Sequence, residues 1–227
     1  MPKSLRALVF DAYGTLFNVH SVMTTCETLF PGKGNALSQL WRTRQLEYSW
    51  LRSLMGRHVD FNQVTRESLQ VACASLGIPY SDAVSVQLNN AYRTLALFDD
   101  ALPTLQRLRR QQPAVKLAIL SNGAAQMLNA VVAYNKLDTM LDAVLSVDEV
   151  AIFKPDPRVY QLACDRLHVN REEIGFVSSN GWDAAGAKSF GFKTFWINRT
   201  NAPIDALGVT PDRVLSSLAE LPILLDA

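Results

Sequence analysis

One carboxylate and three later polar clusters stand where parallel-sheet proteins place their reactive groups. Asp11 comes directly after the apolar run at residues 6–10 (RALVF), and Thr15 lies four residues further on. The other clusters are Ser121-Asn122-Gly123, Lys154-Pro155-Asp156 and the run Ser178-Ser179-Asn180-Gly181-Trp182-Asp183. In open parallel sheets, ligands bind at the carboxyl ends of the strands. We therefore expect these acid, base, amide and hydroxyl groups to converge on one pocket.

This set of side chains suits nucleophilic catalysis by a carboxylate. Aspartate can attack an electrophilic centre and form a covalent intermediate, and a cation within about 4–6 Å favours its charged form. We expect Lys154 to keep Asp11 ionised and oriented. Each residue also has an ordinary structural interpretation, with Asp11 in a turn or helix cap and Lys154 at the surface. The presence of all four clusters together favours the catalytic interpretation.

The elements that must position these clusters alternate along most of the chain. Short apolar runs, typical of buried parallel strands, occupy residues 6–10, 115–120, 143–145, 174–179 and 193–198. Apolar residues at three- and four-residue spacing predict helices over 124–135, 157–167 and 183–191. Alternating strands and helices predict an α/β fold, a doubly wound parallel sheet with helices on both faces.

One segment interrupts this alternation. Between residues 18 and 97 no buried-strand pattern occurs, and helices are predicted over roughly 35–55, 62–77 and 82–96. Gly77 and Pro79 punctuate the last two, as expected at a helix C-terminus. We interpret residues 18–97 as a helical cap subdomain inserted into an α/β core made of residues 1–17 and 98–227.

Composition excludes several classes of protein. The chain has 227 residues, 48% of them hydrophobic, and a net charge of +1, so neither a nucleic-acid nor a membrane partner is indicated. Its cysteines are predicted to be reduced, buried helix residues, and no zinc-type spacing occurs: Cys26, Cys73 and Cys164. The histidines show no ligand spacing: His20, His58 and His168. No signal peptide or long apolar stretch is visible, and we expect a cytoplasmic protein.

The four clusters together resemble those of a known superfamily. The run Phe10-Asp11-Ala12-Tyr13-Gly14-Thr15-Leu16, followed in order by Ser121-Asn122-Gly123, Lys154-Pro155 and residues 178–183, is similar to the haloacid dehalogenase superfamily. Within it, the chain most resembles the L-2-haloacid dehalogenases. The resemblance covers essentially the whole chain, because the helical insert also falls in the expected place.

Two departures separate this chain from the phosphatases of that superfamily. Phosphatases carry a second aspartate two residues after the first, as general acid/base, and this chain has Tyr13 there. Tyrosine does not readily replace a carboxylate that exchanges protons near neutral pH. Where the phosphatases have further magnesium-binding acids, this chain has Ser178 and Ser179, leaving only Asp183. The resemblance therefore implies an enzyme without metal or cofactor. A magnesium-dependent phosphatase and a non-catalytic binding protein remain the alternatives.

The resemblance also implies a reaction and a set of roles. Short L-2-haloalkanoic acids are hydrolysed to D-2-hydroxy acids through an ester on Asp11, so the partners are a small 2-haloacid and its halide product. Catalytic roles fall on Asp11, Thr15, Arg42, Ser121, Asn122, Lys154, Tyr160, Ser178, Asn180 and Asp183. Substrate-binding roles fall on Tyr13, Arg42, Leu46, Phe61, Ser121, Asn122 and Trp182. Arg42 and Asn122 are expected on the halide side, Ser121 at the substrate carboxylate, and Ser178, Asn180 and Asp183 around the hydrolytic water. Members of the family often form homodimers, and a homodimer is a possible state here.

Overall fold

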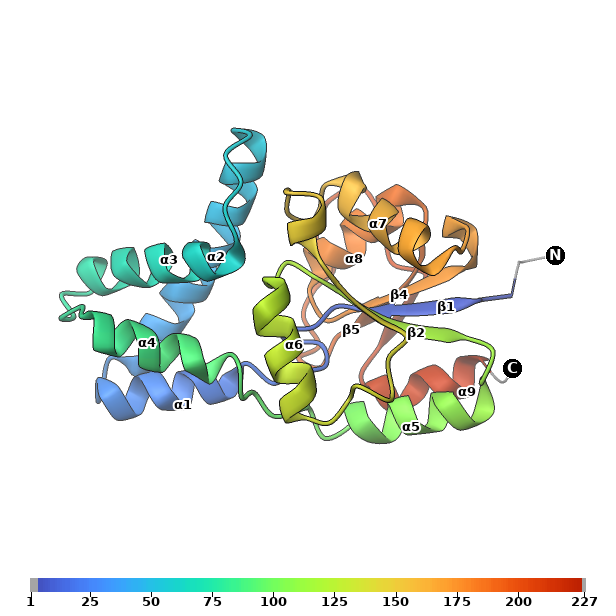
Figure 1. Cartoon of the computed structure of the whole chain (residues 1–227), viewed down its shortest axis with the longest axis horizontal. Helices are drawn as coiled ribbons and strands as arrows, with labels where there is room; N and C mark the ends of the chain where they lie inside the picture. Colours follow the sequence, from blue (N-terminus) through green and yellow to red (C-terminus); the bar gives the residue numbers. More distant parts are fainter. Residues whose placement is uncertain (1–3, 226–227) are drawn as a thin grey trace.

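A parallel six-stranded sheet forms the centre of the computed structural model, which describes residues 4–225 (Figure 1). Its strands are β1 (Ala7–Phe10), β2 (Lys116–Ser121), β3 (Ala143–Ser146), β4 (Ile174–Ser178), β5 (Lys193–Ile197) and β6 (Arg213–Leu215). They lie in the order β3-β2-β1-β4-β5-β6, and every pairing is parallel. This is a doubly wound order, and it places β1 and β4, the strands that carry two of the polar clusters, at the switch point.

The central strands are apolar throughout because helices cover both faces of the sheet. Every residue of β1 and β4 is buried, as expected for strands with no solvent-facing side. In Figure 1, α7 (Pro157–Leu167) and α8 (Gly181–Phe190) lie above the sheet, and α5 (Ala101–Gln111) and α9 (Leu221–Leu225) lie below it. The predicted α/β class is confirmed. Strand β6 was not predicted, because it has three residues at the sheet edge and only Leu215 is buried.

The insert between β1 and α5 is helical. It contains α1 (His20–Leu29), α2 (Gly34–Leu54), α3 (Phe61–Ser75) and α4 (Asp82–Ala91), on the left in Figure 1, while α6 (Ala125–Tyr134) belongs to the core. Two of these helices have side-chain caps, in which Asp60 accepts from Gln63 N and Ser81 accepts from Val84 N. These caps explain why the predicted starts near 62 and 82 are close to those observed.

Two details of the insert differ from the sequence prediction. Helix α1 was not predicted, because only Val22 and Cys26 are buried along its ten residues and its apolar stripe is thin. The helix predicted to reach residue 96 ends at Ala91, although Tyr92 and Leu95 remain buried and continue the apolar spacing. At these positions the apolar spacing therefore indicates buried side chains, although the backbone is no longer helical.

The chain crosses between core and insert twice, and the crossing segments touch. An antiparallel bridge joins Phe17 to Leu97. A division at residues 17/18 and 97/98 remains our interpretation of this arrangement. Within residues 4–225, no helix has both the length and the apolar character needed to cross a membrane.

All three cysteines are free and lie in helices. Cys26 and Cys73 are buried, as predicted. Cys164 is only partly buried, so the prediction of full burial was wrong there. The reason is its position on the outer side of α7, whose buried residues are Val159, Tyr160, Leu162, Ala163 and Leu167.

Candidate active site

Asp11 stands at the carboxyl end of β1 with both carboxylate oxygens held. Its Oδ1 accepts a hydrogen bond from Lys154 Nζ at 3.2 Å. Its Oδ2 accepts from Thr15 Oγ1 at 3.1 Å and from Asn180 Nδ2 at 2.9 Å. Only 9% of the Asp11 side chain is exposed. The carboxylate is therefore fixed in orientation, and Oδ1, with one donor, keeps more of its lone-pair capacity free than Oδ2.

Lys154 is a buried cation between two carboxylates. Its side chain is 1% exposed, so the alternative of a surface lysine is wrong. Besides Asp11, it donates to Asp183 Oδ2 at 2.8 Å. Burial acts to lower the pKa of Lys154, but the charges of Asp11 and Asp183 outweigh burial and raise it. Lys154 consequently stays protonated and balances charge that would be costly to bury alone.

Asp183 holds this lysine from behind. It is fully buried, and its oxygens also accept from Tyr160 Oη at 2.8 Å and from Ser178 Oγ at 3.2 Å. Burial and the nearby charge of Asp11 raise the pKa of Asp183 to about 6, although Lys154 acts to lower it. Asp183 also lies in the first turn of α8, where a negative charge is favoured. The carboxylate therefore has a structural role as well as a place in the charge network.

Tyr160 is both a core residue and part of this network. Its ring is fully buried and packs edge-on against Phe176 and Phe192. Burial, together with the charge of Asp183, raises the pKa of the Tyr160 hydroxyl well above its ordinary value. The hydroxyl is therefore a neutral donor to Asp183.

A small cavity lies on the other side of Asp11, between core and insert. Its volume is about 20 Å³. Its lining consists of Asp11, Tyr13, Arg42, Leu46, Phe61, Ser121, Asn122, Gly123, Lys154, Asn180 and Trp182. All the residues predicted to bind substrate thus face one cavity. Four of the predicted catalytic residues do not line it and pack behind Asp11: Thr15, Tyr160, Ser178 and Asp183.

Three polar groups on this cavity are left without partners among the described residues. The Nδ2 of Asn122 and the hydroxyl of Tyr13 are buried and form no hydrogen bond. Arg42, on α2, forms no hydrogen bond or ion pair within residues 4–225, whereas its neighbour Arg44 pairs with Glu47 at 2.6 Å. Buried polar groups in native proteins are normally paired. These donors are therefore available to a ligand, and because one of them is the charged guanidinium of Arg42, an anion matches them best.

The loop after β2 shapes one wall of the cavity. Asn122 Oδ1 accepts from Lys154 N at 2.9 Å, which fixes the Asn122 side chain while its Nδ2 keeps no partner among the described residues. Ser121 Oγ accepts from Gly123 N at 3.1 Å. A Cβ at Gly123 would lie 2.7 Å from a ring carbon of Tyr13, so only glycine fits there. Helix α6 begins after Ala124, whose side chain provides no capping hydrogen bond, so Ser121 does not cap this helix.

Apolar side chains close the cavity on the insert side. Leu46 comes from α2, and Phe61 is the first residue of α3. Phe61 packs edge-on against Phe153, with ring centroids 6.0 Å apart. Trp182 packs edge-on against Trp50 of α2 at 5.4 Å. These contacts bring residues of the insert against the loops that carry Lys154 and Asn180.

One residue of this region was missed by the sequence analysis. Arg199 donates to Gly14 O at 3.4 Å, to Thr15 O at 3.1 Å and to Ser179 Oγ at 2.7 Å, and it pairs with Asp100 at 3.0 Å. It thereby ties together the loops after β1 and β4 that hold Asp11. Its position directly after the predicted strand at 193–198 was the available signal, because the other clusters also follow strands.

The carboxylates of the site do not fit a divalent cation. Asp11 and Asp183 are the two acids present, and the ammonium of Lys154 lies between them. Within the described residues, no group of three or more His, Cys, Asp or Glu side chains is placed to hold a metal ion. Magnesium requires several oxygen ligands in octahedral geometry. The donor set of this site suits a cationic side chain instead of a metal.

Comparisons with known proteins agree on one family. The haloacid dehalogenase-like hydrolase family matches residues 5–191. A relative from Pseudomonas sp. (strain YL), an (S)-2-haloacid dehalogenase, is 48% identical over 214 residues, which cover 94% of this chain and 91% of the relative. A crystal structure of an L-2-haloacid dehalogenase has a TM-score of 0.96 at 44% identity and covers 99% of this chain and 100% of that one. An L-2-haloacid dehalogenase from Xanthobacter autotrophicus, with chloropropionic acid covalently bound, has a TM-score of 0.91 at 41% identity and covers 98% of this chain and 99% of that one.

Proposed function

The chain belongs to the haloacid dehalogenase-like hydrolases and, within them, to the L-2-haloacid dehalogenases, and we propose that it converts short L-2-haloalkanoic acids into D-2-hydroxy acids through an ester on Asp11. One observation carries the proposal: a buried, oriented carboxylate faces unpaired donors across a small cavity. A nucleophile on one wall and anion-binding groups on another are what displacement of a halide requires.

The first step is attack by Asp11 on C2 of the substrate. Oδ1 supplies the electron pair, because it has one donor while Oδ2 has two. The new C–O bond forms as the carbon–halogen bond breaks, and the halide leaves with the bonding pair. Arg42 and Asn122 receive it, since their donors have no other partner. Displacement inverts C2, so an L-haloacid gives the D-hydroxy acid.

The substrate carboxylate is held at the loop after β2. The hydroxyl of Ser121 lines the cavity, and its oxygen already accepts from Gly123 N, so its proton is available to the ligand. Leu46, Phe61 and Trp182 surround the C2 substituent and exclude bulk water. Exclusion of water strengthens the interactions of the anionic groups with Arg42 and Lys154.

The second step is hydrolysis of the ester. Water attacks the Cγ of Asp11, and the tetrahedral intermediate collapses with cleavage of the Cγ–O bond to the hydroxy acid. The departing oxygen takes up one proton of the water, and the other is released, so each turnover yields one halide and one proton. Asn180 reaches the cavity and contacts Asp11, while Ser178 and Asp183 lie behind it. We assign these three residues to orienting and activating the water.

A single turnover in ¹⁸O-water tests the proposal. With excess enzyme and 2-chloropropionate, the heavy oxygen is expected in Asp11 by peptide mass spectrometry, and not in the first hydroxy acid released. The Asp11→Ala variant is expected to release no chloride. Direct attack of water on C2 would instead place ¹⁸O in the product and refute the ester.

The same preparation separates the two alternatives. Chloride release that is unchanged by EDTA agrees with the proposal. Hydrolysis of phosphate esters that is abolished by EDTA would identify a phosphatase. Binding of haloacids without any release of halide would identify a binding protein.

A further inference from the structure

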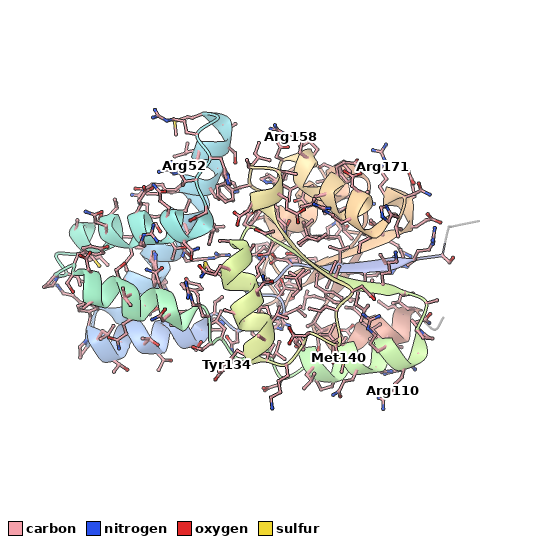
Figure 2. The ribbon with its side chains drawn as sticks, in the orientation of Figure 1. Arg52, Arg110, Tyr134, Met140, Arg158 and Arg171 are labelled. Atoms are coloured by element: carbon pink, nitrogen blue, oxygen red, sulfur yellow. The ribbon has the colours of Figure 1, made fainter. Side chains whose placement is uncertain are left out.

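A larger hollow adjoins the active-site cavity. It has a volume of about 640 Å³ and is lined by Trp50, Ser53, Leu54, Ile152, Phe153, Lys154, Pro155, Asp156, Arg158, Trp182 and Leu207. Lys154 and Trp182 belong to both linings. Figure 2 labels Arg158 of α7, which lines this hollow, and Arg52 of α2, the helix that supplies Trp50, Ser53 and Leu54 to the lining. We call this hollow the outer groove; it is mostly apolar and shares a wall with the cavity.

One face of α2 runs along both spaces. Arg42 and Leu46 line the cavity, and Trp50 and Leu54 line the outer groove. Residues four apart lie on one helix face, and each step of four advances about 6 Å along the axis. The stripe formed by Arg42, Leu46, Trp50 and Leu54 therefore leads from the proposed halide side, past the C2 substituent, into the groove.

Two indole rings stand at the wall that the spaces share, which we call the indole partition: Trp182 lines both spaces, and Trp50 lines the groove. Trp50 and Trp182 meet edge to face, with centroids 5.4 Å apart and an interplanar angle of 78°. The Nε1 of Trp50 is buried and has no hydrogen-bond partner among the described residues. Packing alone therefore holds this ring in place. Trp182 also lines the cavity, so Trp50 is the member of the pair that faces only the groove.

The sizes of the two spaces give the partition a role in substrate choice. The cavity of about 20 Å³ holds little more than one water-sized probe, for which roughly 10–15 Å³ is needed. A longer alkyl tail on C2 exceeds this space, and the wall shared through Lys154 and Trp182 separates it from the groove. Beyond that wall the groove offers apolar surface, including Leu54 and Leu207, which are 84% and 57% exposed.

We propose that the Trp50–Trp182 pair sets the chain-length limit of the enzyme and that the outer groove is a latent subsite for the alkyl tail of longer 2-haloacids. This inference rests on the proposed function, because it concerns the same substrate pocket. With Trp50 in place, the tail meets the indole partition. With a smaller residue at position 50, the tail passes Trp182 and lies along the apolar stripe of α2.

The Trp50→Ala variant tests the inference by a ratio of rates. We compare kcat/KM for L-2-bromohexanoate with kcat/KM for L-2-bromopropionate, which keeps the halogen constant. Each methylene transferred from water to an apolar site contributes about fourfold. The ratio is therefore expected to rise about tenfold over wild type, even if only part of the tail is covered. Trp50→Leu, which preserves more packing, is expected to raise the ratio less and carries the test if Trp50→Ala does not fold.

Leu51→Ala is the matched control. Leu51 is the next residue of α2, is 50% exposed and does not line the groove, so the ratio is expected to stay at the wild-type value. An unchanged ratio in folded Trp50 variants, shown by circular dichroism and melting temperature, would overturn the inference while leaving the proposed function intact. Failure of the wild type to release bromide from L-2-bromopropionate would instead remove the proposed function and this inference with it.

Discussion

The two sides of Asp11 are built in opposite ways. On the core side, Lys154, Asp183 and Tyr160 form a buried network in which every charged group is bonded to a partner. On the insert side, Arg42 has no bonded partner among residues 4–225, and the donor of Asn122 is likewise unpaired. The core side is complete in the protein alone. The insert side keeps donors that no described residue occupies.

This difference separates folding from binding within one site. A fully paired buried network is costly to break, because removal of one partner leaves an uncompensated charge. An unpaired donor on a cavity contributes little to folding, and its interaction energy is available to the substrate. Substitutions on the core side should therefore change stability and activity together, whereas substitutions on the insert side should change activity alone.

Lys154→Met is the strongest test on the core side. It leaves Asp11 and Asp183 buried without their cation, so the free energy of unfolding is expected to fall by about 3–5 kcal/mol. Asp11 also loses the cation that holds its Oδ1, and halide release is expected to fall by about a thousandfold. Urea denaturation and chloride release measure the two effects.

Lys188→Met is the matched control for that variant. Lys188 pairs with Asp212 at 2.6 Å, but its side chain is 35% exposed. Loss of such a pair is expected to cost no more than about 1 kcal/mol and to leave kcat unchanged. A Lys154 variant as stable as this control would contradict the description of the core side.

Arg42→Met is the corresponding test on the insert side. Loss of the guanidinium removes a charged donor for the departing halide, and kcat/KM is expected to fall by about a hundredfold. Stability is expected to change by less than about 0.5 kcal/mol, because no intramolecular partner is lost. Arg44→Met, which breaks only a surface pair with Glu47, should leave both quantities near wild type. A large loss of stability in Arg42→Met would remove the distinction between the two sides.

The core side should also respond to pH through Asp183. The pKa of this group is raised from 3.8 to about 6, chiefly by burial. Activity is expected to decline below pH 6, by about tenfold at pH 5 for a single titrating group. The folded protein holds this proton more tightly than the unfolded chain, so the contribution of Asp183 to stability decreases as the pH rises from about 4 to about 6.

Activity and stability are thus expected to move in opposite directions across that range. The Asp183→Asn variant, which has no proton to exchange there, should flatten the acid limb of the rate profile. If activity still declines below pH 6 in this variant, a group other than Asp183 causes the decline.

The comparison also explains what could be predicted from the sequence. The apolar runs that form β1, β2 and β4, and the polar residues that follow them, placed Asp11, Ser121 and Asn180 at one edge of the sheet. These are local patterns that repeat along the chain. Arg42 lies in the insert, outside these patterns, and its role was predicted from the resemblance to a family.

What the sequence did not reveal depends on contacts between distant segments. Arg199 lies 184 residues from Thr15, and its hydrogen bonds exist only once β5 and the loop after β1 are packed together. The division of the cluster at 178–183, with Asn180 on the cavity and Asp183 behind Asp11, likewise required the geometry of α8. Strand β6 is too short and exposed to leave an apolar pattern.

The smallest effect on activity is expected at Arg199. This residue joins the core side of the site to the segment in which the chain returns from the insert. Its guanidinium contacts Thr15 O and Ser179 Oγ, and it lies 4.0 Å from the ring of Phe98, next to the crossing segment. Arg199→Lys keeps the positive charge beside Asp100 but lacks the fork of donors that reaches both loops. We expect the melting temperature to stay close to wild type while kcat falls about fivefold at unchanged KM, because the Thr15 hydroxyl that orients Asp11 is held less firmly. Equal losses in melting temperature and kcat would show that Arg199 serves only the fold, and an unchanged kcat would show that Thr15 is positioned without it.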